Sequence, residues 1–216
     1  MTLSFETRDA LPMLGAVAAS EKRQPGVDSS AIFCADRERR SAEETRMAKH
    51  IDYSISHTAL GKLLIAATAR GVCRVAFGES EAELEALLKA ELPFAALVRD
   101  EVALKPWSEA LASYVDGHAQ RLDVPLDVAG SRFRMRVWEA LRAIPRGSTR
   151  SYAEVARSLG APHGARAVGQ ACARNPVAIA IPCHRVLAAD GTLGGYAFGL
   201  ARKRALLERE GALSPK

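Results

Sequence analysis

Alternating apolar and polar positions in the first half of the chain predict a small β-sheet. Residues 52–57, 61–68 and 72–77 are β-rich runs, and short turns containing alanine and glycine separate them. Runs this close together pair with their neighbours through tight turns, which is typical of an antiparallel meander. We therefore expect a small antiparallel sheet within residues 49–129.

Two helices are expected after the sheet. The first covers residues 79–93, where acidic residues open the helix and leucines follow at helical spacing. The second begins near Pro106, and an extended segment over 122–126 follows it. Residues 49–129 thus predict an α/β domain whose side chains look structural.

From residue 130 the pattern changes to short helices. Beyond a first helix, the spacing predicts a helix over 152–159, a tight turn over 160–164 and a helix over 165–175. Helix, tight turn and helix at this spacing are typical of a helix-turn-helix, whose second helix enters a DNA groove. The first helix carries its apolar residues on one face, namely Phe133, Val137, Trp138, Leu141 and Ile144.

Small residues dominate the last of these helices, among them Ala165 and Gly169. Its backbone could therefore come close to DNA, which makes both residues candidate DNA contacts. Simple packing between helices explains the same residues as well, so the motif alone leaves both interpretations open.

Residues 1–48 show no sustained periodicity and include a dense charge run. We expect a poorly ordered extension with a short helix near Arg37–Lys49. Residues 11–20 loosely suggest a signal peptide, but acidic residues precede them where basic ones belong, so secretion is not expected.

Composition indicates a globular protein. With 216 residues and 48% hydrophobic content, the chain can bury one large core or two modest ones. No apolar run approaches the roughly 20 residues of a bilayer span, so no membrane partner is expected. The four cysteines form no C-x-x-C pair, which argues against a zinc site or a disulfide framework and favours the reducing cytoplasm.

Charge divides the chain unevenly. Residues 130–216 hold 15 Lys and Arg against 5 Asp and Glu, a net charge of +10, whereas residues 1–129 hold 15 against 20, a net charge of −5. A basic half of this kind favours a nucleic-acid interface. A solvated arginine-rich surface is the alternative, but routine scatter rarely gives so large a difference.

Candidate chemistry lies in residues 181–186, where a histidine directly follows a cysteine. Pro182 fixes its own φ and pushes the preceding residue towards an extended conformation, so the chain should turn sharply as the thiol of Cys183 appears. The stretch offers a nucleophile and, in His184, a base. A lone cysteine is otherwise most often a small buried apolar residue.

Seven motifs in a fixed order extend this picture. They are Phe133-x-x-x-Val137-Trp138, Ser151-Tyr152, Arg166-Ala167-Val168-Gly169, Asn175-Pro176, Ile181-Pro182-Cys183-His184-Arg185-Val186, Gly194-Gly195-Tyr196 and Leu206-Leu207-x-x-Glu210. Together they resemble the methylated-DNA–protein-cysteine methyltransferases, the O6-alkylguanine-DNA alkyltransferases, and especially the Ada-type bacterial branch. The resemblance covers residue 51 to the C-terminus. It implies a ribonuclease-H-like α/β domain over 49–129 and a winged-helix-like, helix-turn-helix domain over 130–216.

The resemblance also implies the chemistry. Cys183 would take the alkyl group from O6 of a flipped guanine in double-stranded DNA, with O4-alkylthymine as a further candidate substrate, and would stay alkylated. His184 would accept the thiol proton through a bridging water, and Glu210 would orient the imidazole. This describes a single-turnover DNA-repair alkyltransferase that works as a monomer without cofactor or metal ion.

Further roles are implied residue by residue. Tyr152 would help to turn the phosphate and would donate to the departing guanine; otherwise it is a core tyrosine. Arg166 would fill the gap left by the flipped base; otherwise it is one phosphate contact among many. Asn175 would brace the turn before the cysteine.

The implied substrate pocket surrounds the cysteine. Tyr196 would form its aromatic wall, Pro182 would line it, and the backbone near Cys183 and Val186 would read the guanine amine. Ala197 stands where some relatives carry a serine, which leaves the substrate range open.

Other function classes explain less of the sequence. A helix-turn-helix regulator accounts for the charge and the helices but not for Cys183, His184 and Glu210 together. A cysteine hydrolase accounts for the Cys-His pair but not for the basic half. The upstream zinc domain of longer Ada proteins is not expected, because residues 1–50 contain only Cys34.

Overall fold

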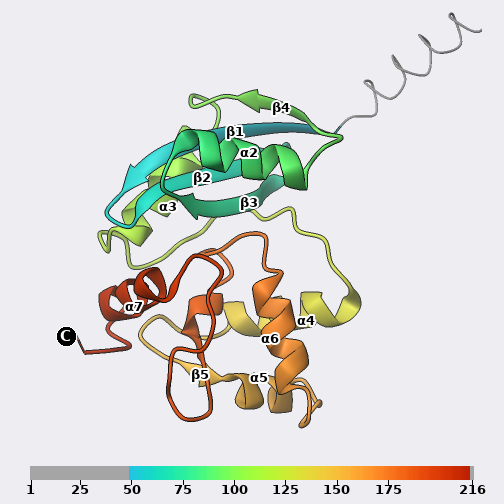
Figure 1. The fold of residues 1–216 in the computed structure, drawn as a ribbon, viewed down its shortest axis with the longest axis vertical. Coiled ribbons are helices and arrows are strands. Elements are labelled where there is room, and N and C mark those ends of the chain that lie inside the picture. The colour runs from blue at the N-terminus through green and yellow to red at the C-terminus, as the bar shows by residue number, and fades with distance from the viewer. Residues whose placement is uncertain (1–48, 215–216) are drawn as a thin grey trace, which may run out of the picture. The chain divides into compact units, whose positions relative to one another are not determined.

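The computed structural model describes residues 49–214 (Figure 1). The extension expected over residues 1–48 lies outside the described residues. So does the short helix expected near Arg37–Lys49, apart from its last residue.

A four-stranded sheet opens the described chain. Strands β1 (His50–Thr58), β2 (Gly61–Thr68) and β3 (Gly71–Gly78) pair in sequence order and antiparallel, which confirms the predicted meander. A fourth strand, β4 (Ala96–Arg99), was not predicted; it pairs parallel to β1, so the sheet order is β3-β2-β1-β4. The sequence did not reveal this parallel strand at the edge of the antiparallel meander, because four residues are too few to show an alternating pattern.

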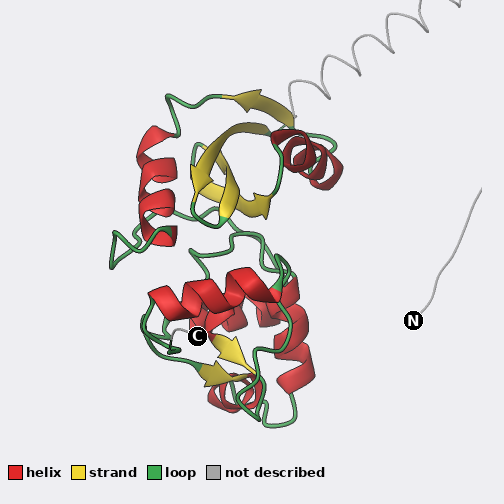
Figure 2. Cartoon of the chain, turned by 60° about the vertical axis from the view of Figure 1, so that its left-hand side comes forward, coloured by secondary structure: helices red, strands yellow, loops and turns green. Residues whose placement is uncertain are grey.

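Two helices cover this sheet on opposite faces (Figures 1 and 2). Helix α2 (Glu81–Glu91) begins after Ser80, whose side chain accepts from the backbone of Glu83, and buries its leucines on one face. Helix α3 (Lys105–Val115) has Pro106 in its first turn, where a missing N–H costs nothing. Both helices confirm the prediction. The segment expected to be extended over 122–126 forms no strand, but its end bridges to β3.

The C-terminal half is mainly helical, as expected. Helix α4 (Arg132–Arg142) is followed by α5 (Tyr152–Ser158), α6 (Ala165–Ala173) and α7 (Leu200–Arg209). Two short strands, β5 (Arg150–Ser151) and β6 (Val186–Leu187), pair in parallel. Helix α7 was not predicted, because its sequence carries five charged residues among ten.

Helices α5 and α6 form the predicted helix, turn and helix. Ser151 and Glu154 make a reciprocal capping box at the start of α5, and Gly160 takes a φ of 73° in the turn, where a side chain would be strained. Helix α6 ends two residues earlier than expected, since Pro176 disfavours helical geometry in the residue before it. Trp138 of α4 donates to the carbonyl of Ala171, which fixes α4 against α6.

One hydrophobic core joins the sheet to the C-terminal helices. Leu63 and Ile65 of β2 belong to the same cluster of buried residues as Trp138 of α4 and Leu206 of α7. The site described below is thus supported from both halves of the described chain. Within residues 49–214, no helix combines the length and apolar character that a membrane crossing requires.

Candidate functional site

Two tight turns present Cys183. Pro182 has φ −79° and ψ 63°, and the N–H of Cys183 donates to the carbonyl of Ile181 over 2.8 Å, which makes an inverse γ-turn. One turn of 3₁₀ helix, η1 (Cys183–Arg185), follows directly. This is the sharp turn that Pro182 predicted.

The chain is strained just before this point. Ile179 has a φ of 73° and is the one non-glycine residue of 49–214 with a positive φ. The N–H of Ala180 donates to the carbonyl of Ala178 across it, over 2.9 Å. Because a β-branched side chain disfavours this region, the conformation costs on the order of 1–3 kcal/mol and must be held by its surroundings.

Asn175 holds both turns together. Its side-chain amide donates to the carbonyl of Ile181 over 2.8 Å and to the sulfur of Cys183 over 3.3 Å. Its side-chain oxygen accepts from the N–H of Val177 over 3.1 Å. One buried side chain thus fixes the start and the end of the strained segment and contacts the thiol.

The thiol of Cys183 is nearly enclosed, with 8% of the residue exposed. Burial raises the pKa of Cys183, and the hydrogen bond from Asn175 and the nearby charge of Lys203 oppose that shift without cancelling it. The sulfur therefore carries its proton at neutral pH and needs a base before it can act as a nucleophile.

His184 and Glu210 form a buried pair. Their Nε2 and Oε1 atoms lie 2.9 Å apart. Burial alone would raise the pKa of Glu210, but hydrogen bonds from His184 and Arg185 outweigh it and lower the pKa to about 2. An ionised carboxylate only accepts, so Nε2 carries a proton and donates to it.

The other ring nitrogen of His184 is left to act as a base. Burial lowers the pKa of His184, which keeps the ring neutral despite Glu210. Within residues 49–214, Nδ1 is buried and has no hydrogen-bond partner. A neutral ring that donates from Nε2 presents a lone pair at Nδ1.

Arg185 and Tyr114 complete the surroundings of Glu210. Arg185 donates to its two carboxylate oxygens over 2.8 and 3.0 Å, and to the carbonyl of Ile144. The hydroxyl of Tyr114 donates to Glu210 over 2.8 Å and accepts from Arg185 over 2.7 Å. Neither residue was assigned a role from the sequence, although Arg185 stands inside the motif with Cys183.

A cavity of about 280 Å³ opens beside the thiol. The ring of Tyr152 lies against Gly169 of the lining and against the neighbouring Gly194: a Cβ on these residues would come within 3.9 and 3.4 Å of the ring, respectively. Burial raises the pKa of Tyr152 to about 12, so its hydroxyl stays protonated and can donate. The lining comprises Tyr152, Gly169, Cys172, Ala173, Cys183, Gly195, Tyr196 and Ala197.

Tyr196 and Cys172 add a buried hydroxyl and a half-buried thiol to this cavity. The hydroxyl of Tyr196 is buried and has no partner in the described part of the chain, and burial raises its pKa well above the ordinary value. Cys172 is a second thiol, which burial gives a pKa of about 12. No role was assigned to Cys172 from the sequence.

Two expected pocket residues do not line this cavity. Pro182 lines a different hollow, and Val186 lies in the core with its carbonyl accepting from Lys203 over 2.6 Å. Lys203 is fully buried and also donates to the carbonyls of Leu193 and Gly195. These hydrogen bonds fix the loop that leads to Tyr196. The only signal in the sequence for the burial of Lys203 is that it precedes the apolar Leu206 and Leu207 by three and four residues on the same helix.

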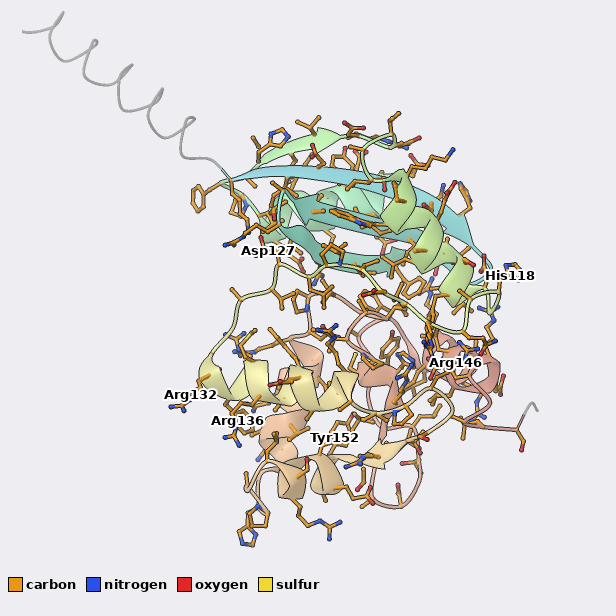
Figure 3. All side chains as sticks on the ribbon, turned by 180° about the vertical axis from the view of Figure 1, so that it is seen from behind. His118, Asp127, Arg132, Arg136, Arg146 and Tyr152 are labelled. Atoms are coloured by element: carbon orange, nitrogen blue, oxygen red, sulfur yellow. The ribbon has the colours of Figure 1, made fainter. Side chains whose placement is uncertain are left out.

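The face of α6 adjoins the cavity. A second hollow, of about 520 Å³, has Ala165 and Arg166 in its lining. It shares Tyr152, Gly169 and Ala173 with the cavity. Figure 3 shows Tyr152 near α5. Arg166 is exposed, and no hydrogen bond or ion pair with residues 49–214 engages it. Those residues contain no cluster of three or more His, Cys, Asp or Glu that could hold a metal ion.

Family comparisons agree with this site. Residues 51–128 match the family described as 6-O-methylguanine DNA methyltransferase, ribonuclease-like domain. Residues 132–212 match the 6-O-methylguanine DNA methyltransferase, DNA binding domain. The predicted fold class, a ribonuclease-like α/β domain before a helical DNA-binding domain, is thereby confirmed.

Individual proteins give the same result. The chain is 39% identical over 160 residues to the Escherichia coli bifunctional transcriptional activator/DNA repair enzyme Ada, which covers 74% of this chain and 45% of Ada. It is 40% identical over 160 residues to a Methanosarcina acetivorans methylated-DNA–protein-cysteine methyltransferase, which covers 74% of this chain and 98% of that protein. The chain spans 45% of Ada and 61–65% of the mycobacterial relatives.

A solved structure extends the comparison to three dimensions. Mycobacterium tuberculosis OGT in complex with DNA superposes with a TM-score of 0.63 at 39% identity, covering 76% of this chain and 93% of that one. Fold, family matches and sequence identity therefore agree. The chain belongs to the methylated-DNA–protein-cysteine methyltransferase family.

Proposed function

We propose that this protein repairs DNA by moving an alkyl group from O6 of guanine to the sulfur of Cys183, once per molecule. One observation carries this function: the thiol borders a cavity of about 280 Å³, and the next residue is a neutral histidine held by a buried carboxylate. The product, S-alkylcysteine, is a thioether without an acidic proton, and we assign no group that would remove the alkyl group from the sulfur. Each protein molecule is therefore consumed by one reaction.

Proton transfer prepares the thiol. The sulfur loses its proton through a water molecule to Nδ1 of His184, and the imidazolium that forms is stabilised by Glu210. Arg185 and Tyr114 keep Glu210 ionised and in place. Asn175 stabilises the thiolate through its amide.

Alkyl transfer then breaks one bond and forms another. The thiolate attacks the alkyl carbon, the carbon–O6 bond breaks, and the electron pair stays on the guanine. Tyr152 donates a hydrogen bond to the departing base, which its raised pKa supports. Tyr196 walls the cavity, and the backbone at Cys183 reads the guanine amine. We give Val186 no part in this, because it lies in the core and its carbonyl accepts from Lys203. Because Pro182 does not line the cavity, we give it only the role of shaping the turn.

Duplex DNA is the proposed partner. Helix α6 enters the groove through Ala165 and Gly169, and Arg166 fills the space of the flipped base. The exposed guanidinium of Arg166 and the net charge of +10 over residues 130–216 support this assignment. We retain a division at residues 129 and 130, which the family matches over 51–128 and 132–212 support.

The same proposal includes action in the cytoplasm as a monomer. Cys73, Cys172 and Cys183 are all free thiols, which a reducing compartment maintains. One chain carries every residue of the proposed site, so the mechanism needs no second copy.

Labelled DNA tests this function. A duplex carrying O6-methylguanine with a radiolabelled methyl group should label the protein covalently, with a plateau at about one methyl per molecule. Peptide mapping should place the label on Cys183, and a Cys183→Ser variant should take up none. A Cys172→Ser variant is the matched thiol control. Turnover beyond one equivalent, or a label on Cys172, would contradict the proposal.

A further inference from the structure

An arginine-lined hollow lies apart from the cavity of Cys183. Its volume is about 540 Å³, and it shares no lining residue with that cavity or with the hollow beside α6. Its walls come from segment 120–126, the residues that end and follow α4, and segment 179–182. The arginines that line it are Arg121, Arg142, Arg146 and Arg185.

Positive charge exceeds negative charge in this hollow. The four arginines face one carboxylate of the lining, Asp123. Arg185 has its own partner, since its Nε lies 2.8 Å from a carboxylate oxygen of Glu210. Asp123 balances the charge of one of the other three arginines. Two guanidinium charges of the lining then remain without a counter-charge. An anion with two negative charges would balance them.

The donors of these arginines differ in how they are used. Arg146 is fixed: it donates to the carbonyls of Ala119 and Arg209, and its guanidinium lies 5.2 Å from the ring centre of Tyr114 (Figure 3). Arg121 and Arg142 are exposed, and neither forms a hydrogen bond or an ion pair with residues 49–214. Arg146 is therefore held in place, whereas the side chains of Arg121 and Arg142 can move to contact a ligand.

We propose that this hollow binds a phosphate-bearing anion through Arg121, Arg142 and Arg146. A guanidinium group presents paired N–H donors that match two phosphate oxygens. A phosphate group is favoured over a single carboxylate because it supplies close to two negative charges and three acceptor oxygens. The phosphate comes from a free di- or polyphosphate compound or from two neighbouring phosphates of a nucleic-acid backbone. This binding goes beyond alkyl transfer, and its test needs no alkylated substrate.

Titration calorimetry with inorganic pyrophosphate tests the site on the full chain at low salt, where screening is weak. We expect binding of one equivalent. The double variant Arg121→Gln/Arg142→Gln should lose affinity by about tenfold or more, since it removes two charged donors. The matched control is Arg132→Gln/Arg157→Gln, which changes the net charge equally at two exposed arginines that do not line the hollow, and its affinity should stay within about threefold.

Each outcome decides the proposal. Absence of pyrophosphate binding to the parent, or an equal loss in both double variants, would overturn it, because the second result reveals only a diffuse positive field. A selective loss supports it. In that case, competition with an undamaged DNA duplex identifies the source of the phosphate. If the duplex displaces pyrophosphate, the hollow binds backbone phosphates. If both bind at the same time, it binds a free phosphate compound.

Discussion

The two sides of the Cys183–Arg185 turn are held by different forces. On the thiol side, a neutral amide of Asn175 reaches the sulfur over 3.3 Å, and a small cavity adjoins it. On the other side, His184 and Arg185 meet an ionised Glu210 over 2.8–3.0 Å. Within one short turn, Cys183 thus has a neutral hydrogen-bond partner, whereas the next two residues have an ionic one.

This difference sets the protonation states. Burial outweighs the hydrogen bond from Asn175 and the charge of Lys203, so the sulfur stays protonated, because desolvation penalises the thiolate. The fixed carboxylate on the other side keeps the imidazole in one tautomer, with Nδ1 ready to accept. A nucleophile and its base can therefore be neighbours in sequence without exchanging a proton prematurely.

Replacing Arg185, the cation beside Glu210, should have the largest effect on stability. Arg185→Ala leaves Glu210 buried with only His184 and Tyr114 as donors, so the free energy of unfolding should fall by about 3–5 kcal/mol. Urea unfolding followed by circular dichroism measures this. Arg185→Lys is the control: it keeps the positive charge but cannot donate two parallel hydrogen bonds to the carboxylate. Its free energy of unfolding should fall by less than that of Arg185→Ala. Equal, small losses in both variants would mean that the ionic side is not a stabilising unit.

Removing the anion should slow the reaction. Glu210→Gln supports a positive imidazole less well, so we expect alkyl transfer to slow by about 100-fold at neutral pH. Raising the pH should restore part of the rate, because the thiol then ionises without help. Single-turnover rates across pH measure both effects. A parent-like rate at neutral pH would remove Glu210 from the mechanism.

Glu210 should also shape acid unfolding. Its pKa is about 2 in the folded protein against an ordinary 4.5, so its contribution to stability is complete above about pH 4.5 and is lost as the pH falls towards 2. Denaturant unfolding at several acidic pH values should show a shallower decline in Glu210→Gln than in the parent. Parallel declines would indicate that other carboxyls dominate.

Breaking the neutral side should cost less. Asn175→Ala leaves the carbonyl of Ile181 without its donor, and we expect a loss of about 1–3 kcal/mol together with a further rise in the pKa of Cys183. Urea unfolding and thiolate absorbance against pH test the two parts. Arg174→Ala, at the exposed neighbour, should change neither. An unchanged thiol pKa in Asn175→Ala would show that the amide does not act on the sulfur.

The smallest expected effect isolates backbone strain. Ile179→Ala and Ile179→Gly empty buried spaces that differ by one methyl group, but glycine tolerates a φ of 73° and alanine does not. We expect the glycine variant to be more stable than the alanine variant by about 1 kcal/mol, the reverse of the usual order in regular structure. Thermal unfolding of the pair decides it, and the usual order would mean that the turn relaxes.

Sequence patterns predicted most of the fold and part of the site. The strands of the meander and the helices α5 and α6 show clear periods, and Cys183 and His184 are adjacent in the chain. Tyr114 could not be found this way, because it occupies an apolar helical position and meets Glu210 across 96 residues. Lys203 escaped for another reason: lysine is usually exposed, and only three backbone carbonyls make its burial tolerable.

The hydrogen bond from Tyr114 to Glu210 has a consequence for how the protein can be divided. All seven motifs quoted from the sequence lie after residue 130, yet this donor and 9 of the 24 buried residues of the shared core come from residues 49–129. A fragment that begins at residue 130 would uncover apolar surface and lose one support of its carboxylate. We therefore expect alkyl transfer to require both regions together, and substitutions within residues 49–129 to alter its rate.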